Sequence, residues 1–235
     1  MEGRNMNFFE TKIIDIVKET SDTYSFKLEI PEGYTWQPGQ RALWRFVDHQ
    51  VEKGDRPIRI FSIASAPVDG YLMFTTRIAE FHTSFKDILL KDVKVGDKMQ
   101  VSDATGDFNI HQEYDNSLII AGGIGITPIR SILKHLSENN LEDHYITVLY
   151  SDDRGEFAYQ EDFKEIQEKM SNLNLYFISS RDEFTERVDV FTKDVQNEAE
   201  YLIAGSPGMN AMFSSRLQGF GVKEENIKTD DFQGY

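Results

Sequence analysis

Two short segments of this chain carry residue types that bind phosphorylated cofactors. The first is Arg59-Ile60-Phe61-Ser62, within a stretch that alternates as β-strands do. A guanidinium can hold a phosphate through two N–H groups. An aromatic ring and a hydroxyl can lie against a flavin ring and near its reactive N5. In an extended segment Arg59 and Phe61 point to one side, and Ile60 and Ser62 to the other. On local sequence alone, an edge strand with solvated arginines is the simpler explanation.

The second segment is a glycine turn, Gly122-Gly123-Ile124-Gly125-Ile126-Thr127-Pro128, between an apolar run and an amphipathic helix. Glycines let the backbone approach a ligand closely, and the N–H groups of the helix start suit a diphosphate. Thr127 is the predicted N-cap and Pro128 the predicted first helical residue. A tight turn without a ligand is the alternative. Gly205-Ser206-Pro207-Gly208 follows a later strand, so we expect it at the same edge of the sheet.

The elements that position these segments differ between the two halves of the chain. From Phe8 to about Ile110, short alternating runs separated by turn residues predict an antiparallel sandwich or barrel, with one short helix at Ser84–Leu90. From about Ser117, apolar runs alternate with helix-period segments, which predicts a parallel sheet with helices on its faces. The predicted domains are 7–112 and 113–235.

Composition narrows the function classes. The 235 residues carry 25 basic and 40 acidic side chains, a net charge of −15, which argues against nucleic acid or anionic lipid as a partner. The chain has no cysteine, so thiolate catalysis and Cys-ligated zinc or iron–sulfur clusters are excluded for it. The histidines have no metal-site spacing. No apolar run is long enough to span a bilayer, and the first six residues do not resemble a signal peptide. We therefore expect a cytoplasmic protein without membrane insertion or a bound metal.

Taken together, the segments resemble the ferredoxin–NADP⁺ reductase superfamily, from about Asn7 to Tyr235. Arg59 to Ser62 matches the family's Arg-x-(Tyr/Phe)-Ser flavin motif, and Gly122 to Pro128 matches its Gly-Gly-x-Gly-x-Thr-Pro nucleotide motif. Gly205 to Met209 is similar to its Cys-Gly-x-Pro-x-Met loop beside the nicotinamide. The resemblance implies a six-stranded antiparallel flavin barrel, then a parallel-sheet NAD(P) domain, in a small single-chain member without an iron–sulfur domain.

The resemblance assigns the flavin to the first half of the chain. It implies that Arg59 contacts the flavin phosphate, that Phe61 lies against the isoalloxazine and that Ser62 sits near N5, with Ile60 in the same motif. The family strand along the pyrimidine and ribityl side matches Thr75, Thr76 and Arg77. The turn at the FAD pyrophosphate matches Thr83 and Ser84, although Phe81 stands where the family usually has glycine.

The resemblance assigns the dinucleotide to the second half. The residues it implies there are Gly122, Gly123, Gly125, Ile126, Thr127, Pro128, Gly205, Ser206, Pro207 and Met209. Thr127 would approach the junction of flavin and nicotinamide. Ala204 replaces the family's usual cysteine, which could slow hydride transfer. At the C-terminus, Phe232 or Tyr235 could cover the flavin face that nicotinamide must reach, and a frayed tail is the alternative.

The choice between NADP(H) and NAD(H) stays open, with a slight preference for NADP(H). The pair Ser180-Arg181 resembles NADP-using members, and Arg187 could add a second cation. Three carboxylates in the same loops would repel a 2′-phosphate or instead bind a ribose diol: Asp152, Asp153 and Asp182.

The sequence therefore predicts a flavin-dependent reductase. Hydride would pass from NAD(P)H to a bound flavin, and FAD is expected in preference to FMN. Ser62, Thr127 and Phe232 would lie at the reacting rings. Electrons would then pass to a carrier such as ferredoxin, flavodoxin or a cytochrome, or to a small acceptor. The alternative is a non-catalytic flavin- or nucleotide-binding module, as a regulatory or electron-transfer subunit of a larger complex.

Overall fold

The chain forms two compact units. The structure, a computed structural model, describes residues 7–111, 113–139 and 144–231. Unit 1 comprises residues 1–107 and unit 2 comprises residues 108–235. The bounds predicted from the sequence, 7–112 and 113–235, stay a prediction.

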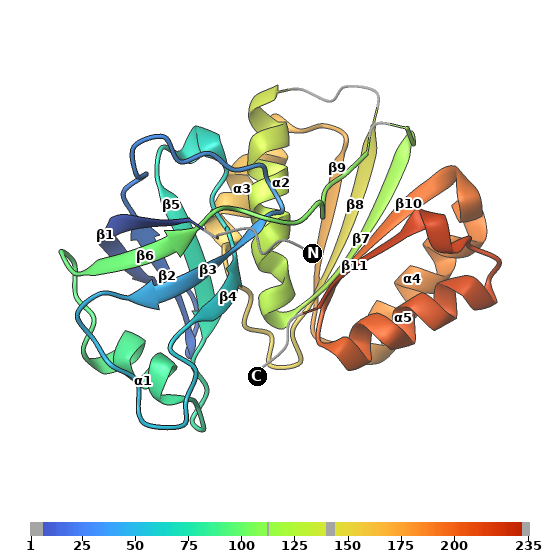
Figure 1. Ribbon diagram of the computed structural model, residues 1–235. Coiled ribbons are helices and arrows are strands. Elements are labelled where there is room, and N and C mark those ends of the chain that lie inside the picture. Colours follow the sequence, from blue (N-terminus) through green and yellow to red (C-terminus); the bar gives the residue numbers. More distant parts are fainter. Residues whose placement is uncertain (1–6, 112, 140–143, 232–235) are drawn as a thin grey trace, which may run out of the picture. The chain divides into compact units, whose positions relative to one another are not determined.

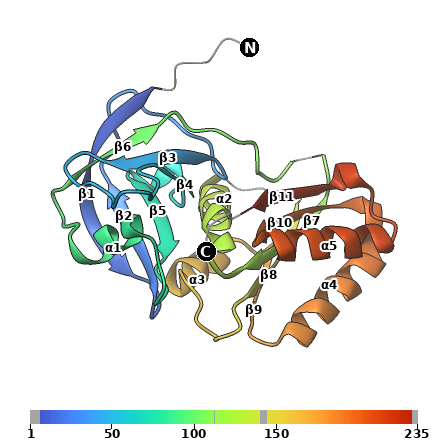
Figure 2. The same cartoon turned by 60° about the horizontal axis from the view of Figure 1, so that its bottom comes forward.

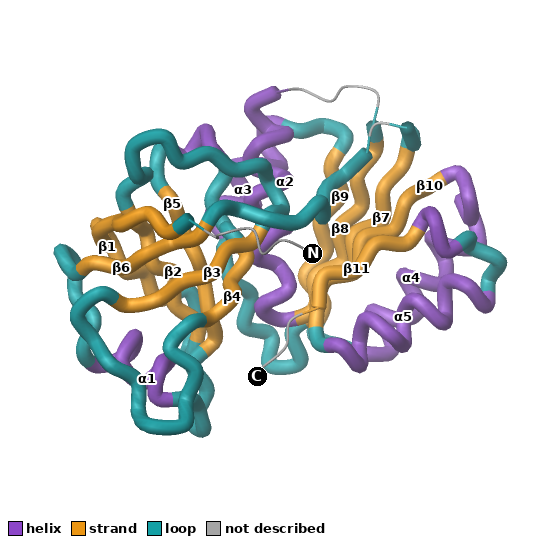
Figure 3. Tube along the Cα trace, viewed as in Figure 1, coloured by secondary structure: helices purple, strands orange, loops and turns teal. Residues whose placement is uncertain are grey.

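Unit 1 is a nearly closed antiparallel barrel (Figure 3). Six strands hydrogen-bond in the order β4-β3-β6-β1-β2-β5. Their bounds are β1 (Phe8–Lys18), β2 (Thr23–Leu28), β3 (Arg41–Phe46), β4 (Arg59–Ser62), β5 (Leu72–Arg77) and β6 (Lys98–Ser102). The Ala64 N–H donates to the Met73 carbonyl, so the chain after β4 meets β5 and draws the two sheet edges together. The fold class predicted for this half is confirmed.

Aromatic side chains fill the barrel. Phe26, Trp44 and Phe74 are each 1% exposed or less. Burial of such a ring stabilises a fold by about 1.5–3 kcal/mol relative to leaving it exposed. Trp36 is also buried.

One helix, α1 (Ser84–Lys91), covers the barrel core, at the predicted position. Thr83 begins it as N-cap, its hydroxyl accepting from the Lys86 N–H. Phe85 is fully buried, and its ring stacks on Phe46 with centroids 4.4 Å apart. The start of α1 is therefore fixed relative to the strands.

Unit 2 is a parallel sheet between two helix layers. Its five strands lie in the order β11-β10-β7-β8-β9. They are β7 (Asn116–Gly122), β8 (Tyr145–Ser151), β9 (Leu173–Ile178), β10 (Ala199–Gly205) and β11 (Ile227–Asp231). The helices are α2 (Ile126–Asn139), α3 (Gln160–Lys169), α4 (Arg181–Val195) and α5 (Pro207–Gly219). Figures 1 and 2 show α2 and α3 on one face of the sheet and α4 and α5 on the other.

Most of this half agrees with the sequence pattern, with two differences. β7 is central and buried, as its apolar run predicts. Helix α4, whose buried side chains include Phe184 and Val188, was not predicted. The sequence spacing predicts Met212 on one helical face with Phe213 and Leu217, which are buried, but Met212 is 51% exposed, so that prediction was wrong. Among the described helices, none combines the length and the apolar character needed to cross a bilayer.

Candidate functional site

The segment Arg59 to Ser62 forms β4 and pairs with β3. The Phe61 ring stacks on Phe74, with centroids 4.9 Å apart and planes 6° from parallel. The Arg59 guanidinium lies 5.3 Å from the centre of the Phe85 ring, and Phe61 lies 6.2 Å from the same ring. Both side chains therefore lie toward α1, which is the alternation predicted for an extended strand.

A carboxylate joins Arg59 to the start of α1. Asp55 Oδ1 forms an ion pair with the Arg59 guanidinium. Asp55 Oδ2 accepts from the Ser84 hydroxyl at 2.9 Å and from the Phe85 N–H at 3.0 Å. The Arg56 N–H donates to Oδ1 at 2.7 Å. Burial raises the pKa of Asp55, but these four bonds outweigh it and lower the pKa to about 2. The donors therefore form a binding site for an anionic oxygen pair.

The two hydroxyls predicted at the pyrophosphate turn lie at the same helix start. Thr83 Oγ1 accepts from the Lys86 N–H at 3.4 Å. Ser84 Oγ accepts from the Glu52 N–H at 3.0 Å and donates to Asp55. The loop before β4 and the first turn of α1 are thus joined through Ser84.

Two more cations lie near Arg59. Lys86 is 9% exposed. Burial, then the charges of Arg59 and Arg77, lower its pKa to about 8, and Asp22 opposes this. Arg77 Nε donates to Asp22 at 2.8 Å. Lys86 and Asp55 were both missed by the sequence analysis, which considered Arg59 and Arg77 alone as the charged groups here.

The remaining predicted flavin residues lie on β4 and β5. Ile60 is 61% exposed, whereas Ser62 is buried. Thr75 Oγ1 lies 2.7 Å from Ser25 Oγ on the neighbouring strand β2. Thr76 is buried beside it. The structure therefore brings Arg59, Phe61 and the start of α1 together, while Ile60 points away from the barrel.

In unit 2, the glycine turn joins β7 to α2 through a short 3₁₀ turn, Gly123–Gly125. A Cβ on Gly125 would lie 2.0 Å from the Ala204 carbonyl oxygen, and a Cβ on Gly122 would lie 2.3 Å from the Met209 sulfur. Packing against β10 and α5 therefore explains two of the glycines. Gly123 has a φ of +53° and open space around it, so the backbone conformation itself favours glycine there.

Helix α2 begins two residues earlier than predicted, at Ile126. Thr127 consequently lies inside its first turn, where its hydroxyl donates to the Ile124 carbonyl at 3.0 Å. The prediction of Thr127 as N-cap was wrong, because the 3₁₀ turn runs directly into the helix. Pro128 still lies in the first turn, where its missing N–H costs no hydrogen bond.

The second glycine loop lies at the same edge of the sheet, because β10 pairs in parallel with β7. Gly205 ends β10, and Ser206 is the N-cap of α5, accepting from the Met209 N–H at 3.3 Å. Pro207 is the first helical residue. Both predicted loops are thus helix starts at the carboxyl ends of adjacent strands, the edge where α/β sheets bind ligands.

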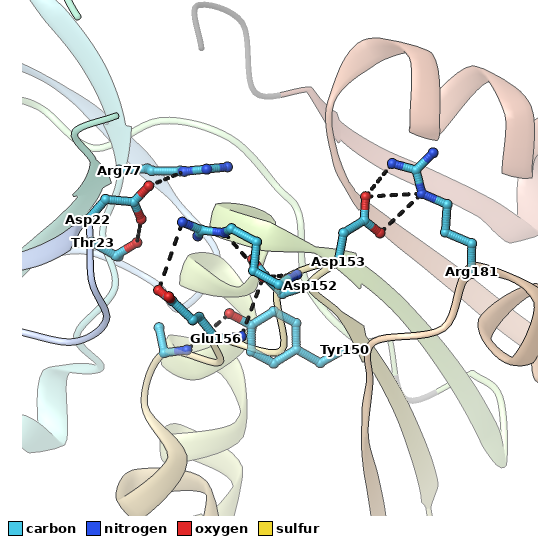
Figure 4. A network of polar contacts seen from close by, with 10 residues as sticks. Asp22, Thr23, Arg77, Tyr150, Asp152, Asp153, Glu156 and Arg181 are labelled. Atoms are coloured by element: carbon cyan, nitrogen blue, oxygen red, sulfur yellow. Dashed lines mark hydrogen bonds and ion pairs between the residues drawn. The ribbon is translucent and has the colours of Figure 1, made fainter. Parts of the chain in front are cut away.

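Arg181 is bound by a carboxylate. It is the first residue of α4, after the N-cap Ser180. Its Nε lies 3.1 and 3.0 Å from the two oxygens of Asp153. Figure 4 shows the two side chains facing each other. Arg187, further along α4, pairs with Glu183 at 2.9 Å. Both candidate 2′-phosphate cations therefore have acidic partners.

Two of the predicted residues, Phe232 and Tyr235, lie outside the described residues. Their role in covering the flavin stays a prediction.

Comparison with known proteins agrees with this geometry. A family model described as "Oxidoreductase NAD-binding domain" matches residues 119–215. One subunit of the Na(+)-translocating NADH-quinone reductase of Mannheimia succiniciproducens is 28% identical over 256 residues, covering 99% of this chain. The same subunit of the Haemophilus ducreyi reductase is also 28% identical. The chain spans 62% of the length of these relatives.

Solved structures share the whole fold. Ferredoxin-NADP⁺ reductase from Plasmodium falciparum superposes with a TM-score of 0.79 at 20% identity, covering 96% of each chain. The FAD/NAD-binding domain of nitric oxide dioxygenase from Vibrio cholerae gives 0.75 at 20% identity, covering 95% of this chain and 98% of that one. This chain therefore has the fold of ferredoxin–NADP⁺ reductase. The resemblance and the fold class predicted from its motifs are confirmed.

The fold shared with these FAD- and NAD-binding structures supports binding of a flavin and a nicotinamide dinucleotide, and the donors of unit 1 have the chemistry that fits a phosphate group. The carboxylate of Asp55 stands in chemically for two phosphate oxygens. It is held by the guanidinium of Arg59, the hydroxyl of Ser84 and the N–H of Phe85. Donors that hold one bidentate oxyanion in this way have the character that phosphate binding requires.

Proposed function

We propose that this chain is a flavin-dependent NAD(P)H oxidoreductase. It would take hydride from NAD(P)H onto FAD and pass electrons to a protein carrier or a small acceptor. The observation that carries the proposal is the convergence of Arg59, Ser84 and the Phe85 N–H on one anionic group, at the element that the sequence motif assigns to a flavin phosphate. Bound FAD would supply the hydride-accepting chemistry, and the chain supplies binding and electrostatics.

On the flavin side, each residue has a distinct part. Arg59 would hold a phosphate with two N–H groups. Phe61 is backed by Phe74, so it offers a fixed apolar wall to the isoalloxazine. Ser62 would sit near N5. A diphosphate fits the local charge better than a monophosphate, since Lys86 and Arg77 lie near Arg59. This favours FAD over FMN.

On the nicotinamide side, the N–H groups at the starts of α2 and α5 would bind the dinucleotide. Both helices begin at the carboxyl edge of the sheet, after β7 and β10. Their dipoles favour a diphosphate there. Ala204 offers no thiol beside Gly205, so hydride transfer would depend on orientation and not on a neighbouring thiol.

The ion pairs of unit 2 favour NADH over NADPH. Arg181 would have to leave Asp153 before it could bind a 2′-phosphate. Arg154, in the same loop, pairs with Asp152 at 3.5 Å and with Glu156 at 3.8 Å. A ribose diol, in contrast, can donate to a carboxylate. The sequence pair Ser180-Arg181 predicts a slight preference for NADP. This proposal instead takes NADH as the preferred dinucleotide.

The ratio of kcat/KM for NADH to that for NADPH tests this choice. Asp153→Asn should lower the ratio by at most about fivefold, because an exposed ion pair is weak and only its loss frees Arg181 for a 2′-phosphate. Glu138→Gln is the control, since it alters an exposed ion pair of the same unit, with Lys169, that is not a candidate for the 2′-phosphate. An NADPH preference in the unaltered protein would contradict the choice of NADH.

The acceptor is open to two candidates. The relatives that cover 99% of this chain are named as a subunit of a sodium-translocating NADH-quinone reductase, which favours an electron-transfer subunit of a larger complex. A free-standing reductase for a carrier or a small acceptor is the other candidate. Reduction of ferricyanide and of a cytochrome by the purified chain would support the free-standing enzyme.

Flavin retention tests the proposal as a whole. The purified protein, mixed with FAD and passed through a desalting column, should remain yellow. Arg59→Ala should lose the flavin, whereas Arg56→Ala, three residues earlier with an exposed side chain, should keep it. Equal retention by both variants would contradict the assignment of Arg59. A wild-type protein that retains neither FAD nor FMN would contradict the function.

A further inference from the structure

The donors assigned to the flavin phosphate already hold a carboxylate of the chain itself. We propose that Asp55 is an internal competitor for the phosphate site of unit 1, and that a flavin phosphate binds by displacing it. The inference rests on the proposed function and goes beyond it, because the sequence motif contains no acidic residue at this place.

The geometry gives Asp55 the bonds that a phosphate would use. Its two oxygens take the Arg59 guanidinium, the Ser84 hydroxyl and the Phe85 N–H. The Phe85 N–H carries one hydrogen and lies at the start of α1, where the helix dipole favours an anion. A single N–H does not form a full hydrogen bond to a carboxylate and to a phosphate at the same time.

Charge repulsion reinforces this competition. A phosphate in contact with Arg59 would lie beside the Asp55 carboxylate, and two like charges a few ångströms apart repel each other. Bonds from Phe85, Arg59 and Ser84 keep the pKa of Asp55 near 2, against the effect of burial, so the carboxylate stays charged at any ordinary pH. Protonation therefore does not relieve the repulsion, and the side chain has to move.

Asp55 is placed on a loop and not on a strand. It lies between β3 and β4, next to Gly54, which is exposed and has a φ of +101°. The Glu52 N–H ties the same loop to Ser84 at 3.0 Å. A rearrangement of the loop between Glu52 and Arg56 would release Asp55 without breaking the pairing of β3 with β4.

The cost of displacement appears as a lower apparent affinity. If Asp55 occupies the donors in about nine molecules of ten, the apparent dissociation constant for a phosphorylated flavin rises about tenfold. Riboflavin has no phosphate, so its binding to the ring site is independent of this competition. This contrast separates a competitor from a residue that merely supports the fold.

Flavin binding is measured by fluorescence for FAD, FMN and riboflavin with the wild-type protein and Asp55→Asn. Asparagine retains an acceptor oxygen for the Phe85 N–H and removes the charge. FAD and FMN should bind the variant about tenfold more tightly, with riboflavin unchanged. Asp87→Asn, on α1 but paired with His82 and Lys91, is the control and should leave all three affinities unchanged.

A second measurement needs no variant. Hydrogen exchange of the wild-type protein with FAD should become slower across unit 1 but faster at the Arg56 N–H, which loses its Asp55 acceptor. Unchanged or weaker FAD binding by a folded Asp55→Asn variant, an equal gain for riboflavin, or a slower Arg56 N–H would each overturn the inference and leave the proposed function intact. Failure of the wild-type protein to bind any flavin would overturn both.

Discussion

Replacing Lys86 by methionine should stabilise the flavin-free protein while weakening its hold on FAD. The side chain is 9% exposed, and its neighbours Arg59 and Arg77 are both cations. Burial and those charges lower the pKa of Lys86 from 10.5 to about 8, with Asp22 opposing. The folded protein thus carries a buried cation that suits a phosphate ligand and costs stability without one.

The magnitude follows from the two pKa values. Because the pKa is lower in the folded state, the stability contributed by the neutral amine is present above pH 10.5 and is lost as the pH falls toward 8. By proton linkage, the charged lysine lowers the free energy of unfolding by up to about 3 kcal/mol at pH 7 and by about 1 kcal/mol at pH 10. Lys86→Met removes this cost, so its gain in stability should shrink as the pH rises.

Urea unfolding of the wild type and of Lys86→Met, at pH 7 and at pH 10, measures the gain in the free energy of unfolding at each pH. Lys91→Met is the control, because that side chain lies on the same helix, is exposed and pairs with Asp87. The control should leave the free energy of unfolding nearly unchanged at both pH values, as expected for an exposed side chain. A Lys86→Met variant that is less stable than the wild type at pH 7, or whose gain does not depend on pH, would refute the reasoning.

FAD should bind the variant more weakly, and equal affinity would exclude Lys86 from the phosphate site.

Three further predictions concern unit 2. Gly125→Ala should destabilise the protein by about 3 kcal/mol or more in urea unfolding, since the new Cβ would meet the Ala204 carbonyl at 2.0 Å; wild-type stability would contradict this packing. Glu200→Leu should cost about 3–5 kcal/mol, because it leaves the Lys228 ammonium, 2.9 Å from the buried carboxylate, without that partner; a neutral effect would mean that Lys228 reaches water. Burial lowers the pKa of His144, so its contribution to stability is present above about pH 6.5 and lost as the pH falls; His144→Asn should flatten the thermal stability profile below pH 6.5, and an unchanged slope would contradict the assignment.

The elements themselves could largely be predicted from periodicity. Alternating runs predicted the barrel strands, and continuous apolar runs such as that of β7 predicted the parallel sheet. Both patterns are informative because they follow from which side chains each element buries. Helix α4 was not predicted because its apolar stripe is sparse. Phe184 and Val188 lie four residues apart among charged side chains. The start of α2 was misplaced because the 3₁₀ turn before it leaves Thr127 already helical.

The chemistry of the site was predictable in part. Arg59 and Phe61 share the side that alternation gives them. The Asp55 bridge was not predictable, because it joins a loop to a helix some 30 residues further along. The glycine turn shows the same limit. Gly125 was interpreted as room for a ligand, whereas its nearest neighbour is the Ala204 carbonyl, which only the tertiary fold brings there.

The central claim is that this chain transfers hydride from a nicotinamide to its own flavin. Anaerobic addition of NADH to the FAD-loaded protein tests it most directly. We predict that the flavin absorbance bleaches with one equivalent of NADH and returns when ferricyanide is added. A protein that holds FAD but stays oxidised with both NADH and NADPH would contradict the claim and favour a binding module.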